Sequence, residues 1–397
     1  MIALEKSRYP RDKVCGDGLT PRAVKELDLM GVPTPAADGW IRNKGLRMVG
    51  GGHRLNFPWP QTPSYPDYGL TLPRAQFDHI LAQHARSTGA DIREGWAVVG
   101  AIRDDNDRVI GVRARETNDQ GRKIGPEVEF RAPLVIAADG VSARVALETG
   151  RERRKRHPMG VAVRTYYQTE RRDEEWMEGH LEVWRGEPRK SKLLPGYGWI
   201  FPLADGVVNV GLGTLSGRGK PSKLDHRSML DDWIRHSTAD WELTPERRIG
   251  PVLGAGIPMA FNRKPHYRDG LMLVGDSGGM VNPFNGEGIA YAMLAARRAA
   301  EAMVDAREAA TDKERERALQ GYVRQLKGDL GGYYRLGLIF AGIIDKPAVM
   351  KICTRYGLPR QNLMWFTHKL LSDVYEPRGG DWADRIIATL ARMAPSA

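Results

Sequence analysis

Cysteine is scarce in this chain, because only Cys15 and Cys353 occur among its 397 residues and they lie far apart. A disulfide framework and a metal site of paired cysteines are therefore excluded, and a reducing compartment is indicated. Long apolar runs are also missing. The longest, residues 336–344, is far shorter than the roughly 20 residues that a membrane-spanning helix needs. We therefore expect a cytoplasmic protein that does not cross a membrane.

Negative charge is in the minority, which leaves a formal net charge of +11 and favours anionic partners. The densest basic run, residues 150–158, contains no aromatic residue and adjoins no nucleic-acid-binding motif. A solvated loop explains this run better than a nucleic-acid groove does, so we expect no nucleic-acid partner.

A glycine-rich phosphate-binding turn is absent too. The apolar residues 2–4 followed by Glu5 are typical of the second strand of a dinucleotide-binding fold. The acid that ends that strand binds a ribose and follows a G-x-G-x-x-G turn by about 20 residues. No such turn occurs in the chain. We therefore expect the natural start to lie upstream of Met1, with about 30 to 40 residues of the βαβ unit, including its first strand and phosphate loop, absent from the chain.

Helix and strand signals alternate along the chain, which indicates an α/β fold with inserted strand-rich segments. Thr20 and Pro21 at one end and Gly31 at the other delimit a helix over residues 21–30. The other expected elements are a hairpin within 46–59, a helix within 72–89, three strands within 96–130 and helices after residue 310.

Two strand ends carry residues suited to ligand binding. One apolar strand, residues 134–138, runs into Asp139-Gly140, and another runs into Gly275-Asp276. Ligands of open α/β sheets bind at the carboxyl ends of the strands, where Asp276 suits the hydroxyl groups of a sugar. The next helix begins near residues 286–288, and its free amides suit an anionic group or a ring carbonyl. A cap or turn role for Asp276 is the alternative.

Tyr197, Trp199 and Phe201 alternate along a predicted strand, so they share one face of it. Such a face makes a smooth apolar wall that suits a long hydrocarbon chain. A strand that faces the protein core would show the same alternation.

Five segments resemble the geranylgeranyl reductase family of FAD-dependent oxidoreductases, which has the architecture of the aromatic-hydroxylase flavoproteins. They are "LEKSRYPRDKVCGDGLTPRAV", "LPRAQFDHIL", "VIAADGVSARVA", "PGYGWIFP" with "VNVGLG", and "LVGDSGGMVNPFNGEGIAYAM". Within that family the chain is most similar to the actinobacterial menaquinone reductases, which saturate one double bond in the isoprenoid tail of menaquinone.

The resemblance implies a cofactor site, a reaction site and a substrate site. The residues expected at FAD are Glu5, Arg74, Asp139, Gly140, Gly275, Asp276, Gly286, Gly288 and Ile289. Cys15 and Gly16 match the catalytic turn beside the flavin. The signature that lines the prenyl site matches Tyr197, Trp199, Phe201 and Pro202.

The same resemblance implies the domain organisation and the activity. The FAD-binding domain would comprise residues 1–38, 72–155 and 262–310, the substrate domain 39–71 and 156–261, and a helical C-terminal region 311–397. The expected reaction saturates a double bond in the tail of a prenyl lipid, with menaquinone as the expected substrate and an electron donor that is not identified.

Several alternatives stay open. Cys15 lies ahead of a helix, whose dipole would stabilise its thiolate and make it a candidate proton donor. A buried and inert thiol fits the sequence equally well. A water molecule is a second candidate for the proton donor. A flavin monooxygenase or halogenase shares the Asp-Gly and Gly-Asp motifs. A flavin-free carrier of prenyl lipids would explain the missing phosphate loop.

Residues 331–357 combine apolar side chains with Tyr333, Tyr334 and flanking Lys and Arg residues. This composition is typical of a segment at a membrane interface. We therefore expect peripheral contact with the inner face of the plasma membrane. A helix packed on the substrate tunnel is the alternative.

Overall fold

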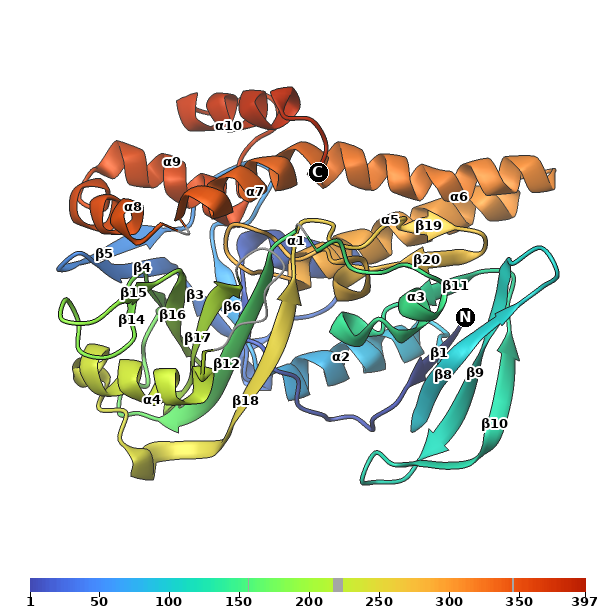
Figure 1. The fold of residues 1–397 in the computed structure, drawn as a ribbon, viewed down its shortest axis with the longest axis horizontal. Helices are drawn as coiled ribbons and strands as arrows, with labels where there is room; N and C mark the ends of the chain where they lie inside the picture. Colours follow the sequence, from blue (N-terminus) through green and yellow to red (C-terminus); the bar gives the residue numbers. More distant parts are fainter. Residues whose placement is uncertain (156, 217–223, 345) are drawn as a thin grey trace.

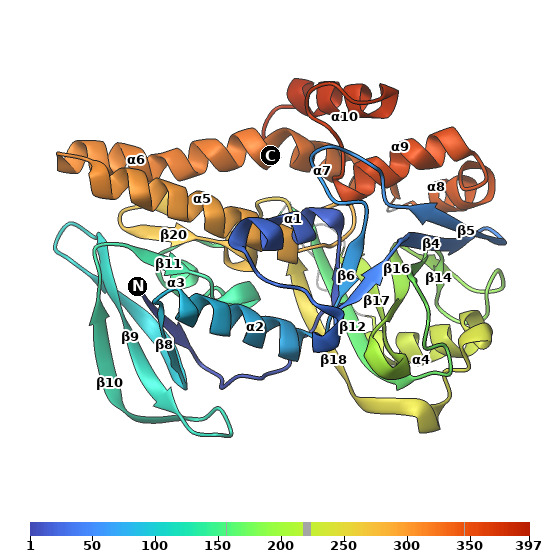
Figure 2. The same ribbon diagram turned by 180° about the vertical axis from the view of Figure 1, so that it is seen from behind.

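The computed structural model describes residues 1–155, 157–216, 224–344 and 346–397. Three parts of the predicted domains lie outside the described residues. Residue 156 and residues 217–223 belong to the predicted substrate-domain segment 156–261. Residue 345 belongs to the predicted C-terminal region. Figures 1 and 2 show two lobes side by side, with the helices of the C-terminal third lying along both.

The lobe that carries the N-terminus contains two pairs of short parallel strands. β1 (Ile2–Glu5) pairs with β7 (Asp91–Glu94), and β11 (Val135–Ala137) pairs with β20 (Leu271–Leu273). β20 also pairs with β19 (Tyr267–Arg268) in antiparallel fashion. In the described residues these pairings form two separate sheets. The predicted strand at 134–138 is thus confirmed as β11.

The same lobe holds the predicted antiparallel meander, formed by β8 (Trp96–Arg103), β9 (Val109–Thr117) and β10 (Lys123–Arg131). The short helix α3 (Arg144–Glu148) is fastened to it, because Glu148 accepts a hydrogen bond of 2.8 Å from the Ala101 amide. The predicted helix within 72–89 is confirmed as α2 (Arg74–Ser87).

A seven-stranded sheet forms the second lobe, in the order β18-β12-β17-β16-β13-β4-β5. Its strands are β4 (Gly45–Gly50), β5 (His53–Pro58), β12 (Met159–Gln168), β13 (Trp176–His180), β16 (Gly196–Pro202), β17 (Val207–Ser216) and β18 (Arg248–Pro258). β4 and β5 form the predicted hairpin. The helix α4 (His226–Ser237) covers one face, where Leu230 and Trp233 pack with Ile200, Val210 and Leu212.

Two small sheets complete the strand structure. The first joins β2 (Gly18–Leu19), β6 (Gly69–Thr71) and β3 (Ile41–Asn43), and the second joins β14 (Val183–Trp184) and β15 (Leu193–Leu194). β2 lies directly after the Cys15 turn. The Thr71 hydroxyl at the end of β6 donates to the Pro202 carbonyl of the seven-stranded sheet at 2.6 Å, which fastens the small sheet to the second lobe.

The helix α1 (Pro21–Met30) has the predicted bounds, and Gly31 ends it with a φ of +70°. Thr20 stands at the N-cap position, but its hydroxyl makes no bond to the helix. The hydroxyl instead donates to a carboxylate oxygen of Glu287 at 2.7 Å. The expected capping bond is thus replaced by a contact with a residue distant in the sequence.

The C-terminal third is helical after residue 310, as predicted. Its helices are α5 (Ile289–Glu308), α6 (Asp312–Leu326), α7 (Gly332–Ile344), α8 (Pro347–Ile352), α9 (Gln361–Ser372) and α10 (Trp382–Met393). Buried tyrosines fasten them to the end of β20 and to the loop that follows it. Tyr322 donates to the Leu273 carbonyl and Tyr334 to the Met280 carbonyl, both at 2.6 Å.

His368 in α9 makes the stability of this region dependent on pH. Its side chain is buried beside Trp59, and neither ring nitrogen bonds to a described residue. Burial lowers the pKa of His368 to about 4, so the folded state binds fewer protons than the unfolded state. We therefore expect this histidine to lower the free energy of unfolding by about 3 kcal/mol as the pH falls from about 6.5 to about 4.

Urea unfolding at several pH values checks this expectation. His368→Phe keeps an aromatic ring beside Trp59 and cannot bind a proton, so it should lack this part of the pH dependence. Parallel stability profiles of the two proteins between pH 7 and pH 4 would contradict it.

Candidate functional site

The two motifs at the strand ends lie side by side. β11 and β20 pair in parallel register, with Ala137 opposite Leu273. Asp139-Gly140 and Gly275-Asp276 follow these strands and therefore lie at the same edge of the sheet. The Ser277 hydroxyl donates to the Ala137 carbonyl at 2.5 Å and holds the two strand ends together. The structure thus brings four of the predicted FAD residues to one place.

Asp139 has a carboxylate oxygen that indicates a ligand. Its Oδ2 accepts a hydrogen bond of 3.2 Å from the Val145 amide, whereas its buried Oδ1 has no partner among the described residues. Burial raises the pKa of Asp139, and the nearby Arg263 opposes the shift. Since buried polar atoms are nearly always hydrogen-bonded, this oxygen suits a hydroxyl donor of a nucleotide cofactor. Gly140 adjoins it with a φ of +69° and open space around it.

The loop before α5 touches both the Gly-Asp motif and the aromatic strand. A Cβ on Gly288 would stand 3.4 Å from Oδ1 of Asp276, and a Cβ on Gly286 would stand 3.6 Å from the Tyr197 hydroxyl. Gly286 has a φ of +77°, which favours glycine. Tyr197 donates its hydroxyl to the Asn285 carbonyl at 2.5 Å. α5 begins at the end of this loop, as predicted, so its first amides have no partner within the helix.

Tyr197, Trp199 and Phe201 share one face of β16. The ring centroids of Tyr197 and Trp199 are 5.9 Å apart, and those of Trp199 and Phe201 are 6.3 Å apart. The opposite face belongs to the core, because a Cβ on Gly198 would clash with Trp233 of α4. Pro202 is buried and follows Phe201 directly, so the alternation of the strand places its ring on the opposite face.

The Cys15-Gly16 turn lies against this aromatic face. A Cβ on Gly16 would stand 3.2 Å from the Phe201 ring and 3.3 Å from the Trp199 indole nitrogen, so the close approach favours glycine. Asn209 of β17 donates to the Cys15 carbonyl at 2.8 Å and accepts from the Trp199 indole at 2.9 Å. The Cys15-Gly16 turn, the aromatic strand and the loop before α5 therefore converge, although they are distant in the sequence.

Asp17 is a site residue that the sequence patterns did not identify. Its side chain is fully buried, and it accepts hydrogen bonds from the Arg74 amide at 3.1 Å, the Tyr166 hydroxyl at 2.8 Å and the Asn209 amide at 2.7 Å. Burial raises the pKa of Asp17 to about 6. The only local signal was an aspartate between two glycines, a residue type that tolerates its φ of +62°.

The surroundings of Cys15 disfavour the thiolate form of its side chain. Burial raises the pKa of Cys15, although the Arg74 guanidinium opposes the shift. α1 begins only at Pro21, and the field of a helix end fades within one turn. The dipole of α1 therefore does not offset the cost of burying a thiolate at Cys15.

Glu5 and Arg74 are linked through two residues that were not predicted. Arg11 bonds to Glu5 at 3.2 Å and to Asp78 at 2.7 Å. Arg74 donates twice to Asp78, each time at 2.8 Å. The four-residue spacing of Arg74 and Asp78 on α2 is the sequence signal for that pair. Because Asp78 engages its guanidinium, contact between Arg74 and a cofactor stays a prediction.

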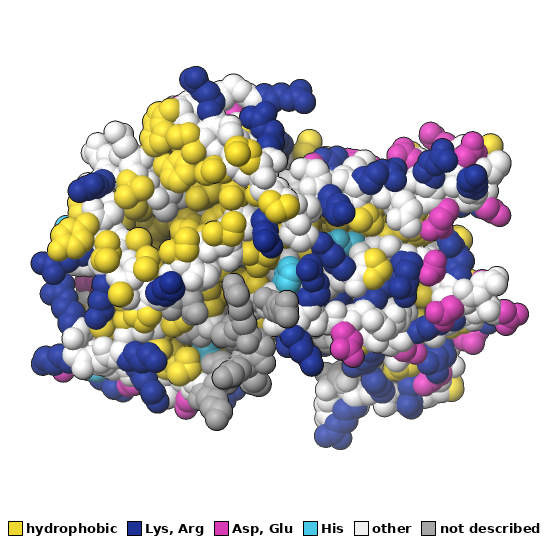
Figure 3. All heavy atoms as spheres, turned by 45° about the horizontal axis from the view of Figure 1, so that its top comes forward, with side chains coloured by type: hydrophobic (Ala, Val, Ile, Leu, Met, Phe, Trp, Pro, Cys, Tyr) yellow, Lys and Arg dark blue, Asp and Glu magenta, His cyan; other side chains and the backbone are white. Residues whose placement is uncertain are grey.

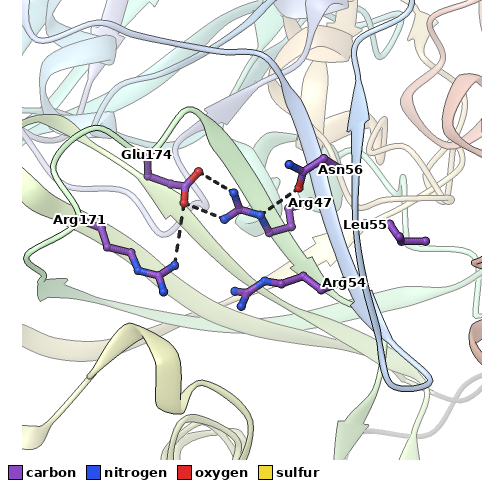
Figure 4. Close-up of a pocket in the computed structure, with 6 residues that line it drawn as sticks. All are labelled: Arg47, Arg54, Leu55, Asn56, Arg171 and Glu174. Carbon is purple, nitrogen blue, oxygen red and sulfur yellow. Dashed lines mark hydrogen bonds and ion pairs between the residues drawn. The ribbon is translucent and has the colours of Figure 1, made fainter.

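A separate pocket of about 450 Å³ lies on the β4–β5 hairpin, lined by Arg47, Arg54, Leu55, Asn56, Arg171 and Glu174. Figure 4 shows Arg47 directed toward Glu174 and Asn56 and Arg171 directed toward Glu174, whereas Arg54 bonds to none of the residues drawn. Arg47 bonds to Glu174 at 2.7 Å and Arg54 bonds to the buried Glu178 at 2.5 Å. Because carboxylates already neutralise these cations, the pocket does not offer an unpaired anion site.

The chain is similar to known flavoproteins and reductases. A family model described as an FAD binding domain matches residues 1–316. Menaquinone reductase of Mycobacterium tuberculosis is 37% identical over 310 residues, which cover 78% of this chain and 72% of the relative. Menaquinone reductase of Mycolicibacterium smegmatis is 31% identical over 389 residues, which cover 98% and 89%.

Solved structures share the fold. A geranylgeranyl bacteriochlorophyll reductase-like protein from Thermoplasma acidophilum superposes with a TM-score of 0.69 at 21% identity and covers 92% of both chains. The flavin-dependent brominase Bmp2 superposes with a TM-score of 0.70 at 18% identity, covering 98% of this chain and 92% of the other. At these identities the likeness shows the α/β flavoprotein architecture alone.

The chain is therefore a flavoprotein with an FAD-binding α/β fold, as predicted. It belongs to the geranylgeranyl reductase family of FAD-dependent oxidoreductases. It is an enzyme, its cofactor is FAD, and its relatives include reductases of prenyl lipids. The unpaired oxygen of Asp139 and the glycine-lined strand ends fit that cofactor.

Proposed function

We propose that this enzyme saturates a double bond in the isoprenoid tail of a prenyl lipid, and that the lipid is menaquinone. The observation that carries the proposal is the aromatic face of Tyr197, Trp199 and Phe201, against which the Cys15-Gly16 turn and the loop before α5 converge. The relatives named menaquinone reductase support the choice of lipid.

One set of residues would bind the cofactor and another would bind the substrate. Asp139 and Asp276 would accept hydrogen bonds from hydroxyl groups of FAD, and the first amides of α5 would bind its ring carbonyl. Bound FAD, when reduced, supplies a hydride to the alkene. The aromatic face would hold the isoprenoid tail and exclude water from the reacting carbons, while the hydrogen bond from Tyr197 to Asn285 keeps the loop against that face.

The second candidate is a flavin monooxygenase or halogenase, which the fold also accommodates. Three adjacent aromatic rings on one strand suit a long apolar tail better than a small aromatic substrate. Rapid oxidation of NADPH with oxygen uptake and without alkene reduction would favour the second candidate.

Mass spectrometry of quinones tests the proposal. Cells that contain the gene should accumulate menaquinone that is heavier by two hydrogen atoms per saturated bond, and cells without it should not. The purified FAD-loaded enzyme should convert menaquinone in the presence of a chemical reductant. Unchanged quinones in both experiments would reject menaquinone, and activity on another prenyl lipid would correct the choice.

We also propose that the enzyme reaches its lipid at a membrane surface through α7–α10. In the described residues, no helix is both long and apolar enough to span a bilayer. Figure 3 shows hydrophobic side chains gathered at this end of the molecule, with Lys and Arg around them. The exposed members of this C-terminal apolar patch are Ile339, Ile343, Ile352, Tyr356, Leu363, Trp382, Ile386, Leu390 and Met393.

The charge around the patch suits anionic lipid. Among the described residues from 346 to 397, the exposed charged side chains are all basic: Lys346, Lys351, Arg355, Arg360, Arg378, Arg385 and Arg392. Each basic residue at an anionic surface contributes about 1 kcal/mol. The acidic residues of the same stretch are buried or half-buried, which leaves this surface positive.

Replacing Ile386 and Leu390 together by glutamate should weaken binding to phosphatidylglycerol vesicles roughly tenfold or more, because two apolar anchors are lost and two like charges face the lipid. Vesicle co-sedimentation measures this change. Val304→Glu, at an exposed apolar residue of α5 outside the patch, is the control and should bind as the wild type does. Equal binding by the double variant and the control would reject the patch.

A further inference from the structure

Glu287 is a half-buried acid whose role the proposed function leaves open. It lies between the two glycines of the loop before α5. Its Oε1 accepts a hydrogen bond of 2.7 Å from the Thr20 hydroxyl, and its Oε2 is buried without a partner among the described residues. A buried carboxylate oxygen without a donor is costly, whereas a protonated carboxyl group tolerates the same place.

The surroundings of Glu287 act on its pKa in opposite directions. Burial raises its pKa to about 7, while the Thr20 hydroxyl and the positive charge of Arg22 oppose the shift. Arg22 is itself paired with the buried Asp373, at 3.0 Å. The titratable groups that face Glu287 from the surrounding elements are Arg22, Tyr197, Tyr291, Tyr334 and Asp373, with Cys15 beyond Tyr197.

The other acids near the convergence point are less suited to give up a proton. Both carboxylate oxygens of Asp17 accept hydrogen bonds from other residues. Neither oxygen is therefore free to carry a proton toward a substrate. The ordinary pKa of a thiol is already higher than that of a carboxyl group, and burial raises the pKa of Cys15 further. Loss of its proton would leave a thiolate at a site where burial disfavours charge. Glu287 combines a free oxygen with groups that stabilise its anion.

We propose that Glu287 is the acid that delivers the proton to the alkene, an inference that rests on the proposed reductase activity. In that reaction the π bond breaks, one carbon accepts the hydride equivalent of the reduced cofactor, and the other accepts the proton of the Glu287 carboxyl group. The O–H bond of Glu287 breaks as the new C–H bond forms. Thr20 and Arg22 stabilise the carboxylate that remains, and a proton from water restores the acid.

Thr20 would position the carboxyl group of Glu287 and stabilise its anion. Its hydroxyl does not cap α1, where a threonine ordinarily bonds to a backbone amide, and donates to Glu287 instead. Loss of this bond should raise the pKa of Glu287, because a donor to the charged form is removed. Thr20→Val is therefore a positioning variant that changes the acid without touching its carboxyl group.

Glu287→Gln tests the proposal, because the amide keeps the shape and can still accept the Thr20 hydrogen bond. We expect product formation to fall by about 10²-fold or more, while FAD content and chemical reduction of bound FAD stay as in the wild type. The wild-type kcat should fall as the pH rises through about 7, where Glu287 loses its proton. Cys15→Ser should retain this alkaline fall, and Thr20→Val should move it to higher pH.

Infrared difference spectroscopy gives a readout that does not need turnover. At pH 6 the wild type should show a C=O stretching band of a protonated carboxyl group that Glu287→Gln lacks. Glu178→Gln is the control, because Arg54 and His180 hold the pKa of that buried glutamate at about 2 and it contributes no such band.

Two results would overturn the proposal: wild-type turnover by Glu287→Gln, or a carboxyl band that is unchanged in that variant. Absence of alkene reduction by the wild type would instead reject the proposed function, and the inference with it. The Thr20→Val profile decides the matter if the glutamine variant fails to fold, since an unmoved alkaline fall would then count against Glu287.

Discussion

Lys369→Met is expected to lower the free energy of unfolding by about 3–5 kcal/mol. The side chain of Lys369 is 2% exposed, and its ammonium group bonds to Asp381 at 2.9 Å and to both carboxylate oxygens of Asp384 at 2.8 Å. Asp384 is equally buried. Methionine fills nearly the same space, so the loss comes from a carboxylate left buried without its cation rather than from a cavity.

Urea unfolding at pH 7 measures this loss. Lys313→Met, at an exposed position in the first turn of α6, is the matched control and should change stability by less than about 0.5 kcal/mol. Lys369→Met combined with Asp384→Asn should recover part of the loss, because the unpaired buried charge is then removed as well. A single variant as stable as the control would contradict the expected role of this ion pair.

The same pair connects the core to the proposed membrane surface. Asp381 caps α10, and Asp384 completes that capping box three residues later. Lys369 in α9 therefore fixes the start of the helix that carries Trp382, Ile386 and Leu390. Partial loosening of α10 should weaken vesicle binding in Lys369→Met even under conditions in which the rest of the chain stays folded.

Local signals were sufficient for most of the elements. The bounds of α1 follow from Pro21 and Gly31, and the β4–β5 hairpin follows from its glycines, because both depend on backbone conformations that neighbouring residues determine. The shared face of Tyr197, Trp199 and Phe201 also follows from the geometry of one strand. The local pattern also marked the two strand ends as ligand sites, and the family resemblance added the expectation that their ligand is FAD.

The side-chain contacts that hold the site together could not be derived in that way. Asp17 bonds to Tyr166 and Asn209, which lie 149 and 192 positions further along the chain. Thr20 and Glu287 are separated by 267 positions. Such pairs exist only because the lobes place separate segments together, so neither residue carries a recognisable pattern by itself. Thr20 illustrates the difficulty, since its sequence position correctly predicts a helix start and conceals its actual partner.

Asp17→Ala is expected to lower the free energy of unfolding by about 3–5 kcal/mol and to lower turnover by about 10²-fold. The substitution leaves the Arg74 amide, the Tyr166 hydroxyl and the Asn209 amide buried without their acceptor. Asn209 also holds the Cys15 carbonyl and the Trp199 indole, so its displacement would move the Cys15-Gly16 turn relative to the aromatic face.

Comparison with Tyr166→Phe separates the two effects. That variant removes one donor to Asp17 and leaves Asn209 in place, so it should lose only about 1 kcal/mol and keep most of its turnover. Urea unfolding and steady-state kinetics of both variants, with visible circular dichroism of the bound flavin, make the measurement. If Asp17 positions the turn, the flavin spectrum changes in Asp17→Ala and not in Tyr166→Phe. Equal spectra with unequal stability would mean that Asp17 supports the fold without orienting the site.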